Sequence, residues 1–172
     1  MKLVGEIIGI LGIIVNFLIY QQKERDSLLK VKLLSDLAWA LHYGLLTAFS
    51  GMAVCLVGAL RETVFILTKD KQDNRKYFLL AFCLISIITS LLTMKDAYGL
   101  LPAVASLIAV FSYWQANTTV TKLLGLPISL TMLTYDFVRF SIMGIINEIL
   151  TIISILIFFI FTYLKRNSKD KK

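Results

Sequence analysis

The sequence predicts an all-α polytopic membrane protein with seven transmembrane helices, set as two parallel three-helix repeats joined by an inversion helix. Of its 172 residues, 58% are hydrophobic and only 17% are charged. The apolar residues form blocks of about 20, the length of helix that crosses a bilayer. Most charges lie between these blocks, and the chain resembles itself on either side of the central block. Together these observations favour membrane spans over one large water-soluble core.

The apolar blocks divide the chain into four parts. Residues 1–68 form the first repeat, 69–95 a charged loop and the inversion helix, 96–164 the second repeat, and 165–172 a basic cytoplasmic tail. The central block, Tyr77–Met94, carries no charge and would span about 27 Å as a helix. The other expected helices are Leu3–Tyr20, Leu29–Ala48, Met52–Thr68, Tyr98–Tyr113, Leu123–Phe140 and Ile142–Leu164.

Three local features refine these helices. The short link Phe49–Gly51 should make the second and third helices antiparallel neighbours. Pro102 lies in a first turn, where a missing N–H costs little, and Pro127 is either a first-turn proline or a mild kink. No small-residue cleavage motif follows the N-terminal block, so we expect a retained first helix and not a signal peptide.

The charged residues predict the orientation. With the N-terminus outside, fourteen of the 18 Lys and Arg residues fall on the cytoplasmic side, and only Lys2, Lys95 and Arg139 fall outside. Inner loops of membrane proteins carry this excess. The net charge of +7 is therefore explained by topology, and its scatter between apolar blocks argues against a nucleic-acid partner. The lipid bilayer is the expected partner, and a homo-oligomer is left open.

An internal repeat emerges when the chain is aligned with itself at an offset of 93 residues, without a gap. Helices one to three then superpose on helices five to seven. A parallel repeat of this kind places any shared binding site between the halves, near the membrane midplane. The identical positions are Tyr20 and Tyr113, Gln22 and Gln115, Leu33 and Leu126, Leu37 and Leu130, and Gly51 and Gly144.

Two families resemble this pattern. The layout, with a glutamine ending each first helix and Trp39, Tyr43 and Gly44 before the short link, is similar to SWEET and PQ-loop transporters. That resemblance implies a fold and not a substrate, because the proline of the PQ pair is absent and Gly58 stands at an asparagine position. The chain more closely resembles the YgjV family of bacterial inner-membrane proteins, which implies the bacterial cytoplasmic membrane. The residues that carry this second resemblance are His42–Leu46, Ala59–Arg61, Leu100–Pro102 and Gly144–Glu148.

Polar residues inside the apolar blocks are the candidate site, because a charge deep in a membrane helix costs about 2.5–3.5 kcal/mol. Asp36 and Tyr43 share one helix face, and the repeat places Ser129 and Asp136 at the same two positions of the second half. The alternative is ordinary hydrogen bonding between helices. The candidate solute-lining residues are Asp36, Tyr43, Ser129, Asp136, Asn147, Glu148 and Thr151, with Asn16, His42, Arg61 and Arg139 as secondary candidates.

Several of these candidates have a plainer explanation. Arg61 would snorkel or pair with an acid, and Asp136 and Arg139, three residues apart, would neutralise each other. His42 is expected to be a hydrogen-bonded packing residue more than a proton relay. If the polar groups do line one space, Tyr43, His42, Asp136 and Glu148 would form a vestibule that opens outward and narrows toward Asp36.

Two functions remain open. One is transport of a small polar solute between the repeats, by rocking of one half against the other. The other is a non-transporting membrane protein, such as a partner or assembly factor of a larger complex. We expect no enzyme and no cofactor, since the sequence offers no nucleophile–base set or phosphate loop. One histidine and two cysteines, Cys55 and Cys83, cannot build a zinc site.

Overall fold

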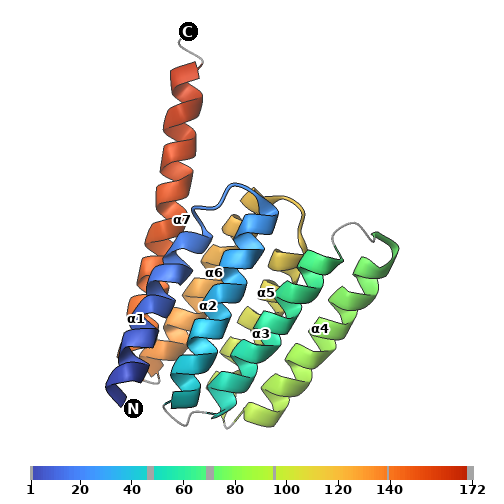
Figure 1. The fold of residues 1–172 in the computed structure, drawn as a ribbon, viewed down its shortest axis with the longest axis vertical. Coiled ribbons are helices and arrows are strands. Elements are labelled where there is room, and N and C mark those ends of the chain that lie inside the picture. The colour runs from blue at the N-terminus through green and yellow to red at the C-terminus, as the bar shows by residue number, and fades with distance from the viewer. Residues whose placement is uncertain (1, 46–48, 69–71, 95, 139, 170–172) are drawn as a thin grey trace.

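The computed structural model describes residues 2–45, 49–68, 72–94, 96–138 and 140–169, and these residues form helices and no strand (Figure 1). The prediction of an all-helical protein is confirmed for this part of the chain. Seven α-helices are present, with one short 3₁₀ turn, Ala97–Gly99, before the fifth. They are α1 (Lys2–Ile19), α2 (Arg25–Leu45), α3 (Phe49–Leu67), α4 (Gln72–Thr93), α5 (Leu100–Trp114), α6 (Thr118–Val138) and α7 (Ile142–Lys169).

Several helices begin earlier than their apolar blocks. α2 begins at Arg25, α4 at Gln72 and α6 at Thr118, because a helix keeps its backbone bonds when its first turn leaves the membrane and needs only a cap. For α6 the cap is Asn117, whose Oδ1 accepts from the Thr119 N–H at 2.9 Å. Since α6 starts there, Pro127 lies well inside the helix, which excludes the first-turn alternative.

Two further boundaries differ from the prediction. Residues 49–51 were expected to link the second and third helices, but they form the first turn of α3, so the connection falls between Leu45 and Phe49. α7 continues through its basic residues to Lys169. In Figure 1 its C-terminal part projects beyond the other helices, and the two ends of the chain lie at opposite ends of the bundle.

The helices pack as two layers. α1, α2 and α3 lie side by side in one layer, and α5, α6 and α7 form the other. The layers meet where α1 contacts α7 and where α3 contacts α5, while α4 packs outside against α3 and α5. The predicted repeat pairs α1 with α5 and α3 with α7, so it makes the α1–α7 contact equivalent to the α3–α5 contact. A two-fold axis between the layers requires this equivalence. This packing is compatible with the predicted repeat, whose boundaries stay a prediction.

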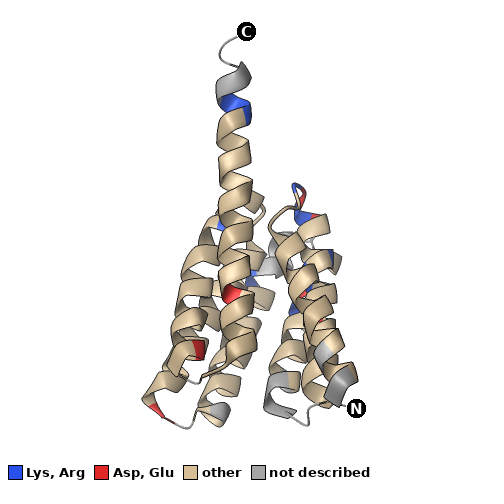
Figure 2. Cartoon of the chain, turned by 90° about the vertical axis from the view of Figure 1, so that its left-hand side faces the viewer, with Lys and Arg blue, Asp and Glu red and all other residues tan. Residues whose placement is uncertain are grey.

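The distribution of polarity is inverted relative to a water-soluble protein. Among the described buried residues, polar and charged side chains are as numerous as apolar ones, whereas exposed positions are rich in Leu, Ile and Phe. Figure 2 shows long uncharged stretches along the outer helices. Soluble proteins almost never bury unpaired Lys, Glu, Arg or Asp, but membrane proteins turn such residues toward the bundle interior.

Two stretches of the described chain, Ala97–Trp114 and Ile142–Arg166, are long and apolar enough to cross a membrane on their own. Ile7–Ile19 and Lys76–Leu92 are shorter apolar helices. The described residues form seven α-helices, as predicted, but the layout in which all seven span the membrane stays a prediction.

Candidate functional site between the two layers

Two ion pairs lie in the first layer, facing the interior. On α2, the Lys32 ammonium contacts the Asp36 carboxylate one turn away. On α3, Arg61 donates from Nε and Nη2 to Glu62 Oε1, at 3.0 and 2.7 Å. The Glu62 side chain has no exposed surface. Of the two alternatives expected for Arg61, snorkelling or pairing with an acid, the structure shows the second.

Gly58 makes room for one of these acids. A Cβ added to Gly58 would lie 2.5 Å from Asp36 Oδ2, closer than any real Cβ contact, so α3 can approach the carboxylate only without a side chain here. The same Cβ would lie 3.7 Å from Glu62 Oε2. These two oxygens are buried and accept no hydrogen bond in the described structure, although buried acceptors are nearly always paired.

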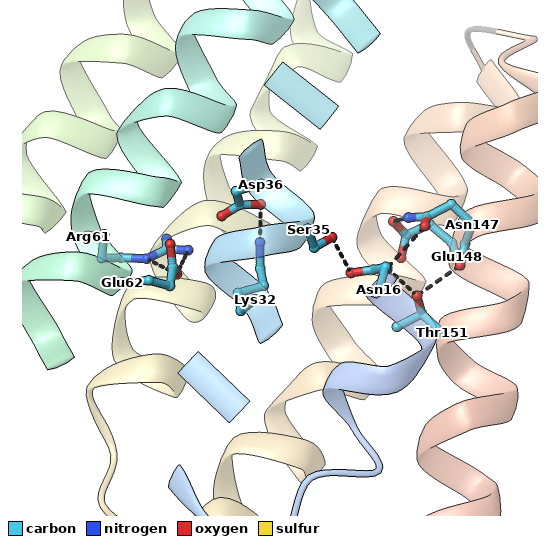
Figure 3. A network of polar contacts seen from close by, with 9 residues as sticks. All are labelled: Asn16, Lys32, Ser35, Asp36, Arg61, Glu62, Asn147, Glu148 and Thr151. Atoms are coloured by element: carbon cyan, nitrogen blue, oxygen red, sulfur yellow. Dashed lines mark hydrogen bonds and ion pairs between the residues drawn. The ribbon is translucent and has the colours of Figure 1, made fainter. Parts of the chain in front are cut away.

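A second polar network joins both layers near the α1–α7 contact (Figure 3). Asn16 of α1 donates to Asn147 Oδ1 at 3.0 Å and to Thr151 Oγ1 at 2.8 Å, both on α7. The Asn147 amide in turn donates to Glu148 Oε1 at 3.0 Å. On the other side, the Ser35 hydroxyl of α2 donates to Asn16 Oδ1 at 3.4 Å. Asn16 thus connects α7 to the face of α2 that carries the ion pair.

The two halves fill equivalent positions with different chemistry. Where the first half has Asp36 against Gly58, the second half has Ser129 and Thr151, so a carboxylate and a bare backbone are replaced by two hydroxyls. Ser129 is buried and hydrogen-bonded to the Glu148 carboxylate. At this position the carboxylate is therefore Glu148 of α7 in the second half and Asp36 of α2 in the first half.

Two tyrosines lie at the centre of the interface. Tyr20 ends the first helix of one repeat and Tyr113 that of the other, and their buried hydroxyls are hydrogen-bonded to each other. In the predicted repeat, such a contact between equivalent residues would lie on the axis that relates the halves. Lys32 Nζ lies 5.7 Å and Arg61 Cζ 5.2 Å from the centre of the Tyr113 ring, within the range of cation–π attraction.

Two reciprocal contacts join the halves at the end of the bundle from which α7 projects. Arg25 Nε of the first half donates to the Gln115 carbonyl at 2.8 Å. Lys122 Nζ of the second half donates to the Gln22 carbonyl, the equivalent position of the first half. Lys122 is fully buried, with Nζ 3.2 Å from the centre of the Phe158 ring. Each cation meets the negative end of a helix of the other half. We call these two contacts the inner brace.

At the opposite end of the interior, a second acid, Asp136, packs against a glycine, Gly144. A Cβ added to Gly144 would lie 2.5 Å from both Asp136 oxygens, and the Asp136 side chain is hydrogen-bonded to Ser141. Tyr43 is half-buried at this end and interacts electrostatically with Asp136. His42 packs differently, with Nδ1 2.7 Å from the Gly5 carbonyl.

Comparison with known protein families identifies the family of this chain. A family model described as Imp-YgjV, bacterial inner membrane protein, matches residues 3–166. The chain belongs to this family. The resemblance to the YgjV family is thus confirmed over nearly the whole chain. The expectation of a bacterial inner-membrane protein is confirmed with it. No curated protein and no solved structure matches the chain, so the likeness to SWEET and PQ-loop proteins stays a prediction.

Some of the candidate residues in this YgjV-family protein lie together in one network, and the others lie apart from it. Asn16, Ser129, Asn147, Glu148 and Thr151 come together in one network. Asp36 and Arg61 lie in separate ion pairs in the first layer, Tyr43 and Asp136 lie at the far end, His42 packs against α1, and Arg139 with its expected partnership lies outside the described residues.

Other residues of the site were missed at the sequence level. Lys32 and Lys122 were only counted among the cytoplasmic cations, yet Lys32 is half-buried and Lys122 is fully buried. For Lys32 the available signal was its spacing of four residues from Asp36, which suits an ion pair on one helix face. For the two central tyrosines the signal was their identity across the repeat.

Proposed function

We propose that this YgjV-family protein carries a small polar solute across the bacterial inner membrane, through the interior between the two layers. The observation that supports this most is the pair of buried carboxylate oxygens, Asp36 Oδ2 and Glu62 Oε2, which no donor of the described structure satisfies. Lipid offers no donor either, and an unpaired buried acceptor is costly. A solute with hydroxyl or amide N–H groups would supply the missing hydrogen bonds.

The arrangement of the halves suits alternating access. Among the described residues, the helices of the two layers pack together mainly along two seams, α1 with α7 and α3 with α5, so one three-helix block could tilt against the other as a rigid body. The inner brace closes the end where the basic loops lie, and opening that end would require Arg25 and Lys122 to release their carbonyls. The predicted orientation makes this closed end cytoplasmic and the solute site accessible from outside.

The test is uptake by proteoliposomes. Purified protein is reconstituted and given radiolabelled polyols, sugars, amino acids and amides in turn, with Asp36→Asn and Glu148→Gln as variants and Lys165→Met, an exposed position on α7, as a control. We expect one solute class to accumulate above empty vesicles, with loss in the first two variants only. Uptake equal to that of empty vesicles for every class, from folded protein, would refute transport.

A second function is favoured by a different observation. Most polar groups of the Asn16 network and of the Arg61–Glu62 pair are hydrogen-bonded within the protein. Such groups need no solute, which favours a non-transporting protein that binds a partner in the membrane. Cross-linking in the native membrane followed by purification would then recover one stoichiometric protein partner. Recovery of that partner from cells, together with inactive proteoliposomes, would favour this alternative.

A further inference from the structure

The buried charges of the interior do not balance at Glu148. Neither of the two ion pairs described in the structure includes this residue. Its carboxylate instead receives neutral donors, the Asn147 amide at 3.0 Å and the Ser129 hydroxyl. Neutral donors orient a carboxylate but do not cancel its charge. A net charge inside a helix bundle surrounded by lipid is strongly disfavoured.

The repeat shows how the first half solves the same problem. There the acid, Asp36, has a permanent cation one helical turn away, Lys32. The position equivalent to Lys32 in the second half is Gly125, where even a Cβ would lie 2.6 Å from the Tyr20 ring. The second half therefore has a glycine, packed against Tyr20, where the first half has its cation. Asp36 is thus neutralised by the fold, whereas the charge state of Glu148 depends on what it binds.

From this asymmetry, and on the basis of the proposed function, we propose that Glu148 binds one proton from water and releases it during the transport cycle, so that the solute moves together with a proton. The step is simple protonation of the carboxylate to a carboxylic acid, with no other bond made or broken. Asp36, Glu62 and their cations form a fixed polar wall and do not exchange protons in this scheme.

Each element packed around Glu148 contributes to its surroundings. The charged or titratable side chains that interact with it electrostatically are Tyr20 of α1, Lys32 and Tyr43 of α2 and Asp136 of α6. Lys32 and Asp136 thus act on the Glu148 carboxylate with opposite charges. Because attraction and repulsion oppose each other, a modest movement of α2 relative to α7 would decide between the two forms.

The hydrogen bonds around Glu148 allow both protonation states. A serine hydroxyl can donate to a carboxylate or accept from a carboxylic acid by rotation about its C–O bond, so Ser129 can serve both. The proton's presence is also sensed across the layers. Asn147 links Glu148 to Asn16, and Asn16 accepts from Ser35, the neighbour in sequence of Asp36. Protonation thus alters a chain of contacts that spans the α1–α7 seam.

The experiment is infrared difference spectroscopy of the full-length protein in lipid, between alkaline and acidic buffer. Protonation of Glu148 should produce a carboxylic acid C=O band that moves to lower frequency in D₂O and corresponds to one proton per chain. Glu148→Gln should remove the band completely. Glu62→Gln is the matched control, because it changes a more deeply buried glutamate that Arg61 neutralises, and it should leave the band unchanged.

Further variants keep the assignment testable. If Glu148→Gln does not fold, Ser129→Ala retains the acid but removes one hydrogen bond, and should shift the band to higher frequency without removing it. A band that persists in Glu148→Gln, or that disappears in Glu62→Gln, would overturn the proposal. So would loss of the band on adding Na⁺ at constant pH, which would assign the site to a metal cation.

The spectroscopic result does not depend on transport. A band assigned to Glu148 in a protein that moves no solute would uphold the proton site and refute the proposed function. Solute uptake that is equal with and without an imposed pH gradient, with no such band, would do the reverse.

Discussion

The Arg61–Glu62 pair allows a quantitative prediction about how this interior is held together. Arg61→Met removes two charge-assisted hydrogen bonds, of 3.0 and 2.7 Å, each of about 1.5–3 kcal/mol. It also leaves the fully buried Glu62 carboxylate without its partner. Breaking a buried pair from one side costs about 3–5 kcal/mol, and we expect a loss of unfolding free energy in this range.

The double variant separates the pair from its members. Arg61→Met combined with Glu62→Leu replaces both charges by apolar groups of similar size, so it should recover stability to within about 1 kcal/mol of the wild type. Unfolding in dodecyl maltoside micelles titrated with SDS measures each free energy. Arg166→Met, at an exposed position of α7, is the control and should change it by less than about 0.5 kcal/mol.

Two outcomes would contradict this reasoning. A cost below about 1 kcal/mol for Arg61→Met would mean that the guanidinium reaches water, as the snorkelling alternative holds. A double variant as unstable as the single one would mean that shape and not charge makes the pair necessary.

Three further predictions concern neighbouring features. Gly58→Ala places a Cβ 2.5 Å from Asp36 Oδ2 and should cost about 1–3 kcal/mol in the same unfolding assay; an unchanged midpoint would show that the carboxylate moves aside freely. Asn16→Leu removes the donor that joins α1 to α7 and should cost about 1–3 kcal/mol, which Asn16→Gln should not restore because the amide is displaced. Single cysteines placed at Glu24 or at Asp96, in a chain lacking its two native cysteines, should react with a membrane-impermeant maleimide from the cytoplasmic side and from the outer side, respectively. Labelling of both positions from the same side, or of each from the opposite side, would refute the predicted orientation.

Much of the helical layout could be predicted because apolar block length is a strong signal in a membrane. The boundaries were less predictable, since a helix does not end where its apolar residues end. α6 shows this, because its first turn is set by the Asn117 cap and not by hydropathy. The link before α3 was placed too late for a related reason, since the small residues Ser50 and Gly51, which suggested a link, are also compatible with a first turn.

The candidate site was predictable where repeat and helical phase agreed. Asn147 and Thr151, four residues apart on α7, meet one partner, Asn16. The basic partners were harder to place, because a lysine near a helix end can extend toward water or fold inward, and sequence depth does not distinguish the two. Lys122 folds inward only because the Gln22 carbonyl of the other half accepts its hydrogen bond, a contact between residues far apart in the chain.

The length of α7 has a consequence for the inner brace. Lys122 lies at the level of Phe158, while the first basic residue of α7 beyond that point is Lys165, about 10 Å further along the helix axis. If the lipid surface follows the basic residues of α7, the contacts of Arg25 and Lys122 sit beneath the phospholipid headgroups, where mobile ions are scarce. Dissolved salt should then screen them poorly, so this closure would hold equally well in dilute and in concentrated buffer.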